Sequence, residues 1–302
     1  FSIRVVLPRH GICLILPFGG RRMLPTEDSY GLAKRIEFLV TEIERRNPQR
    51  VLDFGCGTGD NLTVPLAERY PHIQFIGVDS DETSIAYARR SCELGNLEFR
   101  HYPREFAFDE KFDVIVASEV LEHVDEPDIF LTTLRGSLAP GGALIVTIPN
   151  GYGPYELGSL AATLLQLSGL YALLRKLKHA LFATPHPDQT QVDTLAISPH
   201  VNFFSFGELR RLFNTLGLAV VSYRSRTFLC GFGFDQLLRG AGVLRWNARG
   251  ADHLPPQIVS DWMFVLVPGQ APVEGRFQRG TYARLRRWLN YRRHGLHDRS
   301  SR

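Results

Sequence analysis

The chain has 302 residues, 44% of them hydrophobic, and a formal net charge of +4 at neutral pH. This length and hydrophobic content suit one large domain, or one domain with a substantial insertion, rather than several small domains. The cysteines are too scattered for a metal site and are read as reduced thiols of a cytoplasmic protein. They are Cys13, Cys56, Cys92 and Cys230.

The first 22 residues are expected to be an extension with little role in the fold. The apolar run Val5–Phe18 is interrupted by a proline, an arginine and a histidine, so it is too short and too broken to span a membrane. Met23 begins a stretch that reads like a true start. Whether residues 1–22 are native to the protein stays open.

From residue 31 onward the sequence predicts strands that alternate with helices. Gly31–Asn47 has apolar residues at helical spacing, and Pro48 ends that helix. A later helix is expected at Phe206–Asn214. Seven strands are expected at Val51–Phe54, Phe75–Asp79, Leu97–His101, Val114–Ser118, Ala143–Ile148, Ala219–Tyr223 and Trp262–Pro268. This alternation predicts a doubly wound α/β fold, with a mostly parallel sheet and right-handed crossovers.

The segment VLDFGCGTGDN, which includes the first predicted strand, is the strongest sign of a ligand site. Its glycines Gly55, Gly57 and Gly59 let the backbone turn sharply and let a ligand approach without meeting a Cβ. The acid Asp53 precedes them. The second strand ends at Asp79, where an acid can accept hydrogen bonds from both ribose hydroxyls of a nucleoside.

The glycine spacing is G-x-G-x-G, which differs from the dinucleotide fingerprint G-x-G-x-x-G. It resembles motif I of the class I S-adenosylmethionine-dependent methyltransferases. Three later segments resemble that family in the expected order. They are GVDSDETSIAYAR (Gly77–Arg89), FDVIVASEVLEHVDEP (Phe112–Pro127) and LAPGGALIVTIPN (Leu138–Asn150).

The resemblance implies S-adenosyl-L-methionine as the cofactor and a seven-stranded sheet of order 3-2-1-4-5-7-6 with an antiparallel seventh strand. It implies that Asp53 supports the loop and the amino end of the methionine moiety. The backbone of Gly55 and Gly57 would pass beneath the cofactor, in the turn completed by Gly59. Asp79 would hold the ribose.

Adenine recognition departs from the family pattern. Family members usually carry an acid just after the third strand, where this chain has Tyr102 and Pro103. Apolar contact, backbone groups, or Asp81 and its neighbours are the alternatives.

The segment EVLEH after the fourth strand supplies candidate catalytic residues. At helical spacing Glu119, Glu122 and His123 would share one face. The same ExxEH pattern occurs in ubiquinone-pathway O-methyltransferases and in small-RNA 2′-O-methyltransferases, where a later histidine completes a metal site. His200 resembles that histidine in context. The four residues suit Mg²⁺, Mn²⁺ or Zn²⁺. In the alternative, Glu119 supports the cofactor loop, and His123 either lines the pocket or acts as a lone general base.

Residues 151–199 form an insertion between the fifth and sixth strands. Leu157–Leu174 contains no charge, but its serines, threonine, glycines and glutamine make it too polar for a membrane span. A helical cap over the substrate pocket fits better, and contact with a membrane stays open. The insertion separates a cofactor-binding half, residues 23–150, from a C-terminal half, residues 200–268.

Residues 269–302 are expected to form a basic tail. From Arg276 to Arg302 there are nine arginines and one acid, so this part carries +8 and the rest of the chain about −4. Such a tail suits an anionic membrane surface or, less well, nucleic acid. A solvated terminus is the alternative.

These features predict S-adenosylmethionine-dependent methyl transfer to a small or lipophilic acceptor, most simply at oxygen. The apolar insertion favours a lipophilic substrate. An RNA methyltransferase is one rival, supported by the tail and the EVLEH segment, but the chain lacks a recognisable RNA-binding module. A non-catalytic cofactor-binding partner protein is the other, and the intact glycine loop argues against it. The predicted location is cytoplasmic, with membrane association left open.

Overall fold

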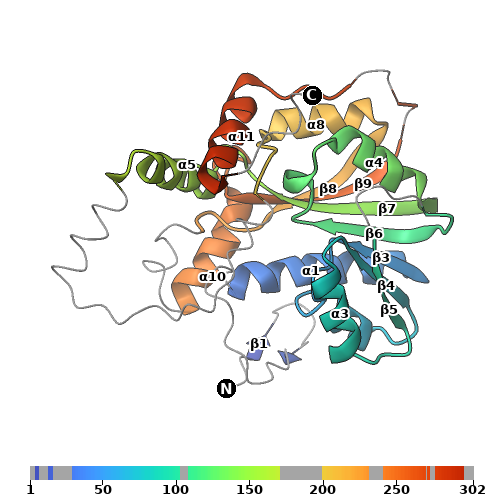
Figure 1. The fold of residues 1–302 in the computed structure, drawn as a ribbon. Coiled ribbons are helices and arrows are strands. Elements are labelled where there is room, and N and C mark those ends of the chain that lie inside the picture. The colour runs from blue at the N-terminus through green and yellow to red at the C-terminus, as the bar shows by residue number, and fades with distance from the viewer. Residues whose placement is uncertain are drawn as a thin grey trace.

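The computed structural model describes residues 4–6, 13–15, 29–102, 108–170, 199–230, 241–269, 271–272 and 276–295. A seven-stranded sheet lies at its centre, with helices on both faces (Figure 1). Its strands are β3 (Arg50–Phe54), β4 (Gln74–Asp79), β5 (Leu97–His101), β6 (Phe112–Ser118), β7 (Leu138–Pro149), β8 (Leu218–Ser225) and β9 (Asp261–Pro268). Two short strands, β1 (Arg4–Val6) and β2 (Cys13–Ile15), pair antiparallel outside this sheet.

The helices connect these strands as the sequence predicts. They are α1 (Ser29–Arg46), α2 (Thr63–Arg69), α3 (Glu82–Ser91), α4 (Pro127–Gly136), α5 (Pro154–Leu167), α8 (Phe206–Thr215), α10 (Ala241–Gly250) and α11 (Thr281–His294), with 3₁₀ turns η1 (Leu121–His123) and η2 (Ala251–His253).

The strand order is β5-β4-β3-β6-β7-β9-β8. The first five strands run parallel, and β9 pairs antiparallel with both β7 and β8. In order of appearance this is 3-2-1-4-5-7-6 with an antiparallel seventh strand. The predicted fold class is therefore confirmed.

Two hydrophobic layers bury the faces of the sheet. Successive residues of a strand point to opposite faces, so Leu52 packs in the layer of α4 and α8, whereas Val51 packs in the layer of α1 and α2. Burial on both sides explains why the strands read as continuous apolar runs. The parallel strands β3, β4 and β6 end at one edge, where ligand sites form in open α/β sheets.

The insertion and the tail meet in the structure. The insertion begins with α5, and the described part of the tail forms α11, which packs on α5. The rest of the predicted cap, residues 171–198, lies outside the described residues, as do residues 231–240 between β8 and α10 and the tail end 296–302. Most of the expected extension 1–22 is also outside them.

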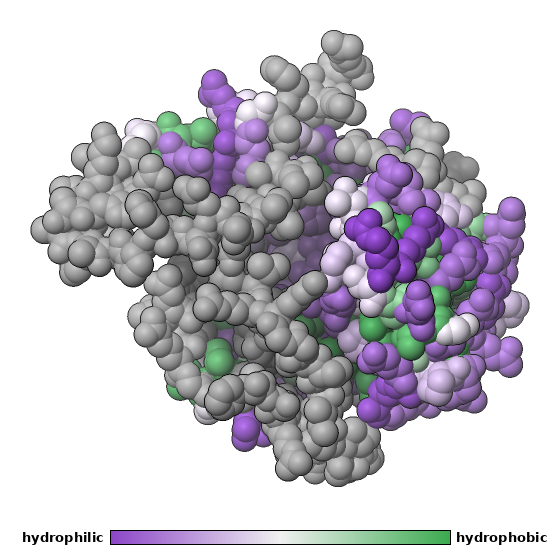
Figure 2. Space-filling view, turned by 60° about the horizontal axis from the view of Figure 1, so that its bottom comes forward, coloured by the Kyte–Doolittle hydropathy of each residue, from purple (hydrophilic) through white to green (hydrophobic). Residues whose placement is uncertain are grey.

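The surface seen from below in Figure 1 is mostly hydrophilic where it is described, with hydrophobic residues gathered in a patch among the charged ones (Figure 2). Among the described residues, no helix has both the length and the apolar composition needed to cross a bilayer. Cys56, Cys92 and Cys230 are free thiols.

Candidate functional site

The glycine loop after β3 turns back against β4. Gly55, Gly57 and Gly59 have φ between +55° and +78°, a region that side chains with a Cβ rarely adopt. The Gly55 N–H donates to the Val78 carbonyl at 2.8 Å. A Cβ at Gly55 would overlap the side chain of Val120, whereas a Cβ at Gly57 would meet no atom within 4 Å. Gly55 is therefore required for packing, and Gly57 borders open space.

Asp79 ends β4 directly beside this open space. Its Oδ2 accepts a hydrogen bond from the Gly57 N–H and its Oδ1 accepts one from the Asp81 N–H, both at 2.8 Å. Each carboxylate oxygen has a second lone pair, so Asp79 can hold the loop and still accept hydrogen bonds from a ligand.

Asp53 lies in β3 and is buried beneath the loop. Its Oδ2 accepts a hydrogen bond from the Thr63 hydroxyl at 2.6 Å, which ties the strand to the first turn of α2. Burial raises the pKa of Asp53 to about 6, against the lowering effect of that hydrogen bond. The carboxylate therefore braces the loop.

Two of the three alternatives for adenine can be compared in the structure. The carboxylate of Asp81 caps α3 and accepts hydrogen bonds from the backbone of Thr83 and Ser84. The Tyr102 ring lies 4.8 Å from that of Phe108, between centroids, on the β5 side of the site. The exposed carboxylate of Asp81 keeps lone pairs, as that of Asp79 does, so Asp81 and apolar contact near Tyr102 are both alternatives for adenine in the structure. Pro103 lies outside the described residues.

The prediction that Glu119 shares one helical face with Glu122 and His123 is wrong. The Glu119 N–H still pairs with the Thr147 carbonyl of β7, so this residue continues the β6 strand register, and its φ is +57°. Its Oε1 accepts a hydrogen bond from the Thr147 hydroxyl at 2.7 Å and lies 3.7 Å from the Arg35 guanidinium. A short 3₁₀ turn, and no α-helix, follows it.

Glu122, His123 and His200 do come together, since one ligand atom from each lies within 4.8 Å of the others. Glu122 is buried, and its Oε2 has no hydrogen-bond partner in the described structure. Burial, and then the charge of Glu119, raises the pKa of Glu122 to about 8. His123 Nδ1 lies 3.4 Å from the Pro199 carbonyl oxygen, and its Nε2 lies 4.0 Å from Glu122 Oε1.

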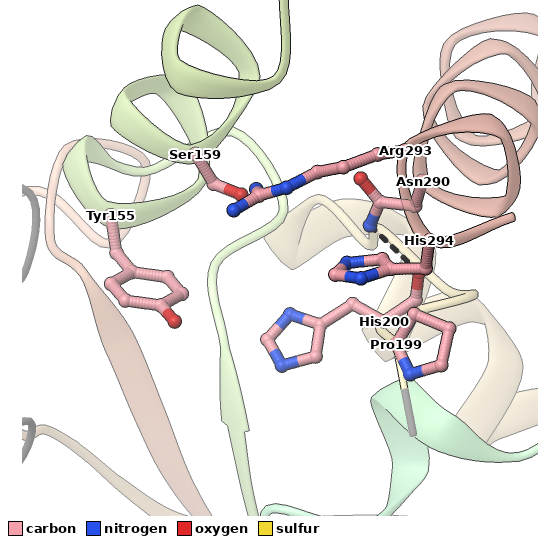
Figure 3. Close-up of a pocket in the computed structure, with 7 residues that line it drawn as sticks. All are labelled: Tyr155, Ser159, Pro199, His200, Asn290, Arg293 and His294. Atoms are coloured by element: carbon pink, nitrogen blue, oxygen red, sulfur yellow. Dashed lines mark hydrogen bonds between the residues drawn. The ribbon is translucent and has the colours of Figure 1, made fainter. Parts of the chain in front are cut away.

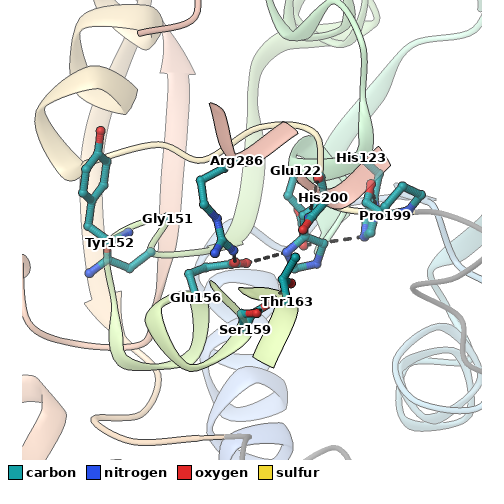
Figure 4. A network of polar contacts seen from close by, with 12 residues as sticks. Glu122, His123, Gly151, Tyr152, Glu156, Ser159, Thr163, Pro199, His200 and Arg286 are labelled. Carbon is teal, nitrogen blue, oxygen red and sulfur yellow. Dashed lines mark hydrogen bonds and ion pairs between the residues drawn. The ribbon is translucent and has the colours of Figure 1, made fainter. Parts of the chain in front are cut away.

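Glu156 joins His200 to the C-terminal helix (Figure 4). Its Oε1 lies 2.5 Å from His200 Nδ1, and its Oε2 lies 2.7 Å from the Arg286 guanidinium. Burial lowers the pKa of His200, but the charge and hydrogen bond of Glu156 outweigh it, with help from Glu122 and Glu119, and raise the pKa to about 9. The pairing with Glu156 therefore favours the positively charged form of His200.

Helix α11 closes this side of the site. Asn290 donates to the His200 carbonyl at 3.1 Å, and Arg293 donates to the Thr163 hydroxyl at 3.2 Å. A small pocket opens between α5, α11 and His200 (Figure 3). It is lined by Tyr155, Ser159, Pro199, His200, Asn290, Arg293 and His294. Part of the predicted basic tail is thus built into the candidate site.

Sequence reasoning missed Glu156 and Arg286. The one signal for Glu156 is that it is the only charged residue of α5, a lone acid in an otherwise uncharged helix. Arg286 is one of seven arginines between residues 276 and 295, and nothing in that spacing marks it as buried.

A family model described as a methyltransferase domain matches residues 26–223, more than half of the chain. A trans-aconitate 2-methyltransferase of Variovorax paradoxus is 31% identical over 112 residues, covering 37% of this chain and 43% of that protein. A ubiquinone biosynthesis O-methyltransferase of Dinoroseobacter shibae is 36% identical over 105 residues, covering 33% and 41%. The matches thus span less than half the length of either relative.

One solved structure is similar over most of its length. It is the O-methyltransferase from a trans-AT PKS multienzyme of Brevibacillus brevis in complex with S-adenosyl-L-homocysteine. The TM-score is 0.50 at 17% identity, covering 86% of this chain and 78% of that one. At this identity the similarity shows the fold alone.

Removing Arg286 should destabilise the protein, because the buried carboxylate of Glu156 then loses one of its two cationic partners. Arg286→Met is expected to lower the free energy of unfolding by about 3 kcal/mol. Arg284→Met, at an exposed position of the same helix, is the control and should change it by less than about 0.5 kcal/mol. Urea denaturation measures both. Equal effects would contradict the account.

The His200–Glu156 pair should make stability depend on pH. The folded pKa of His200 is raised from 6.5 to about 9, so its contribution is complete below pH 6.5 and disappears as the pH rises through 9. The full contribution is about 3 kcal/mol. In metal-free buffer, the difference in unfolding free energy between wild type and His200→Gln should therefore shrink from pH 6 to pH 10. A constant difference would mean that His200 is neutral.

Proposed function

Because the chain belongs to the methyltransferase domain family, we propose that it transfers the methyl group of S-adenosyl-L-methionine to an oxygen atom of a small, lipophilic acceptor. The observation that supports binding of S-adenosyl-L-methionine is the geometry of the loop after β3. There the backbone of Gly57 borders open space directly beside the carboxylate of Asp79.

In this proposal the cofactor lies over the loop. Gly55 and Gly57 pass beneath it, Gly59 completes the turn, and Asp79 uses its remaining lone pairs for the ribose hydroxyls. Asp53 acts mainly by bracing the loop, with the methionine end of the cofactor above it. The rings near Tyr102 supply apolar contact for adenine.

The chemistry needs alignment and one proton acceptor. Bound S-adenosyl-L-methionine would supply an activated methyl group, whose transfer to the acceptor oxygen would break the carbon–sulfur bond and release S-adenosyl-L-homocysteine. The protein would then mainly supply proximity. We assign the proton to His123. Its Nδ1 faces the Pro199 carbonyl, which favours the tautomer that keeps the proton on Nδ1 and leaves Nε2 basic. The positive charge on His200 nearby would favour an acceptor oxygen that becomes an anion.

A divalent metal is the alternative for this centre. The unpartnered Oε2 of Glu122 suits an ion, and Glu122, His123 and His200 would hold it. Such an ion would supply a lowered pKa for the acceptor hydroxyl. Glu119 does not fit the set, because Thr147 engages its carboxylate. The pairing of His200 with Glu156 is compatible with this alternative, because Glu156 engages Nδ1 and leaves Nε2 as the nitrogen that would bind the ion.

The nature of the acceptor is inferred from the insertion. One relative is named for ubiquinone biosynthesis, which favours a lipophilic acceptor, and the outward leucines of α5 would let such an acceptor reach the site from a membrane. We include an anionic membrane surface, reached through the insertion and the tail, as the proposed partner. An RNA acceptor is less well supported because Arg286 and Arg287 of the tail are buried and ion-paired. A non-catalytic role is disfavoured by the open, intact glycine loop.

Asp79→Ala should weaken S-adenosyl-L-methionine binding by about 1–3 kcal/mol, because two ribose hydroxyls lose their charged acceptor. Isothermal titration calorimetry measures this. Asp60→Ala, which removes an exposed carboxylate from the same loop, is the matched control and should bind like wild type. Unchanged affinity in a folded Asp79→Ala protein would contradict the assignment of Asp79 to the ribose but not the assigned fold.

The base assignment and the metal alternative respond differently to a chelator. We expect transfer of labelled methyl from S-adenosyl-L-methionine into a lipid extract to persist in EDTA. His123→Ala should lower this rate 10²- to 10⁴-fold with little change in cofactor affinity. Loss of transfer in EDTA, restored by Mg²⁺, Mn²⁺ or Zn²⁺, would instead establish the metal.

A further inference from the structure

Helix α5 buries polar residues and exposes apolar ones. Its buried positions are polar, since Glu156, Ser159 and Thr163 are 1%, 8% and 0% exposed. Leu157 and Leu164, by contrast, are 51% and 49% exposed. Leu167 and the following Leu170 are exposed as well. A surface helix of a globular protein normally shows the reverse arrangement, so this leucine face is suited to a partner.

Helix α11 lies beside α5 and extends this surface. The stacking of Tyr152 on Tyr282 and the pairing of Glu156 with Arg286 show that the two helices run in the same direction. Leu285 and Trp288 are 54% and 48% exposed on α11. Together with the leucines of α5 they are here called the α5–α11 face.

Arginines accompany the apolar residues of this face. Arg284 and Arg292 are exposed on α11, and the Arg292 guanidinium lies 4.8 Å from the centre of the Trp288 ring. From residue 276 to 295 there are seven arginines and no acid, and the only acid of α5, Glu156, is buried. The described part of this face therefore carries positive charge without an exposed carboxylate.

We infer that the α5–α11 face binds an anionic membrane surface. Leucine and tryptophan side chains suit the boundary between headgroups and acyl chains, and arginines suit the anionic headgroups above it. A second copy of the chain fits less well, because neither helix offers an exposed acid to the arginines. The biological purpose of this binding rests on the proposed function. The inward sides of the same two helices hold His200, so a protein bound to the membrane would receive a lipophilic acceptor next to the site.

Vesicle flotation of the full chain tests this without requiring turnover. Wild type should float with phosphatidylglycerol-containing vesicles, bind pure phosphatidylcholine less, and lose binding as salt rises from 0.05 to about 0.5 M. Leu164→Ser with Leu167→Ser, and separately Trp288→Ala, should each lower partitioning about tenfold or more. Ile129→Ser and Trp246→Ala are the matched controls, since they remove exposed apolar residues from α4 and α10, and should bind like wild type.

Three results would overturn the inference. They are absence of wild-type binding to the anionic vesicles, face variants that bind as tightly as the controls, or a concentration-dependent dimer in sedimentation velocity that the same substitutions abolish. Calorimetry with S-adenosyl-L-methionine separates this from the proposed function, because the face variants should keep their cofactor affinity. If a variant fails to fold, Arg284→Gln with Arg292→Gln and the wild-type salt titration still decide the question.

Discussion

The buried carboxylate of Glu156 is the constraint on which the rest of the candidate site depends. An uncompensated charge in a protein interior costs several kcal/mol, so Glu156 must keep its cations. Its two oxygens are used by His200 and Arg286, which come from different segments of the chain. One carboxylate therefore fixes the insertion, the segment before α8 and the C-terminal helix against one another.

The inward position of Glu156 also determines the outer surface. Leu157 and Leu164 each follow an inward-facing residue, Glu156 and Thr163, and so lie about 100° around the helix, where they face solvent. The ion pair that organises the candidate catalytic centre thus creates the apolar face that we assign to a membrane. The proposed acceptor site and the proposed membrane face thus lie on the same two helices.

The sheet and the cofactor loop could be predicted from the sequence because their signals are local. A strand, a glycine turn and an acid at a strand end are each specified within a few residues. The structure joins Gly57 to Asp79 and ties Asp53 to Thr63. The proximity of His123 and His200 is also predicted from the sequence, but only because the EVLEH segment and the later histidine resemble those of a known family.

The errors and omissions come from long-range contacts. Spacing predicts a helical position for Glu119, but pairing with Thr147 across the sheet keeps it in the strand register. Glu156 and Arg286 are 130 residues apart, and no local pattern reveals that they meet. The basic tail shows the same limit, because composition describes its charge but not the burial of two of its arginines.

The central claim is that this site transfers a methyl group to a lipophilic acceptor. The most direct measurement is to incubate the full chain with methyl-labelled S-adenosyl-L-methionine and separate lipid, quinone, sugar and RNA fractions. The account predicts label in the lipid or quinone fraction, dependent on His123. Label confined to RNA or sugar would contradict it, as would tight cofactor binding with no transfer to any fraction.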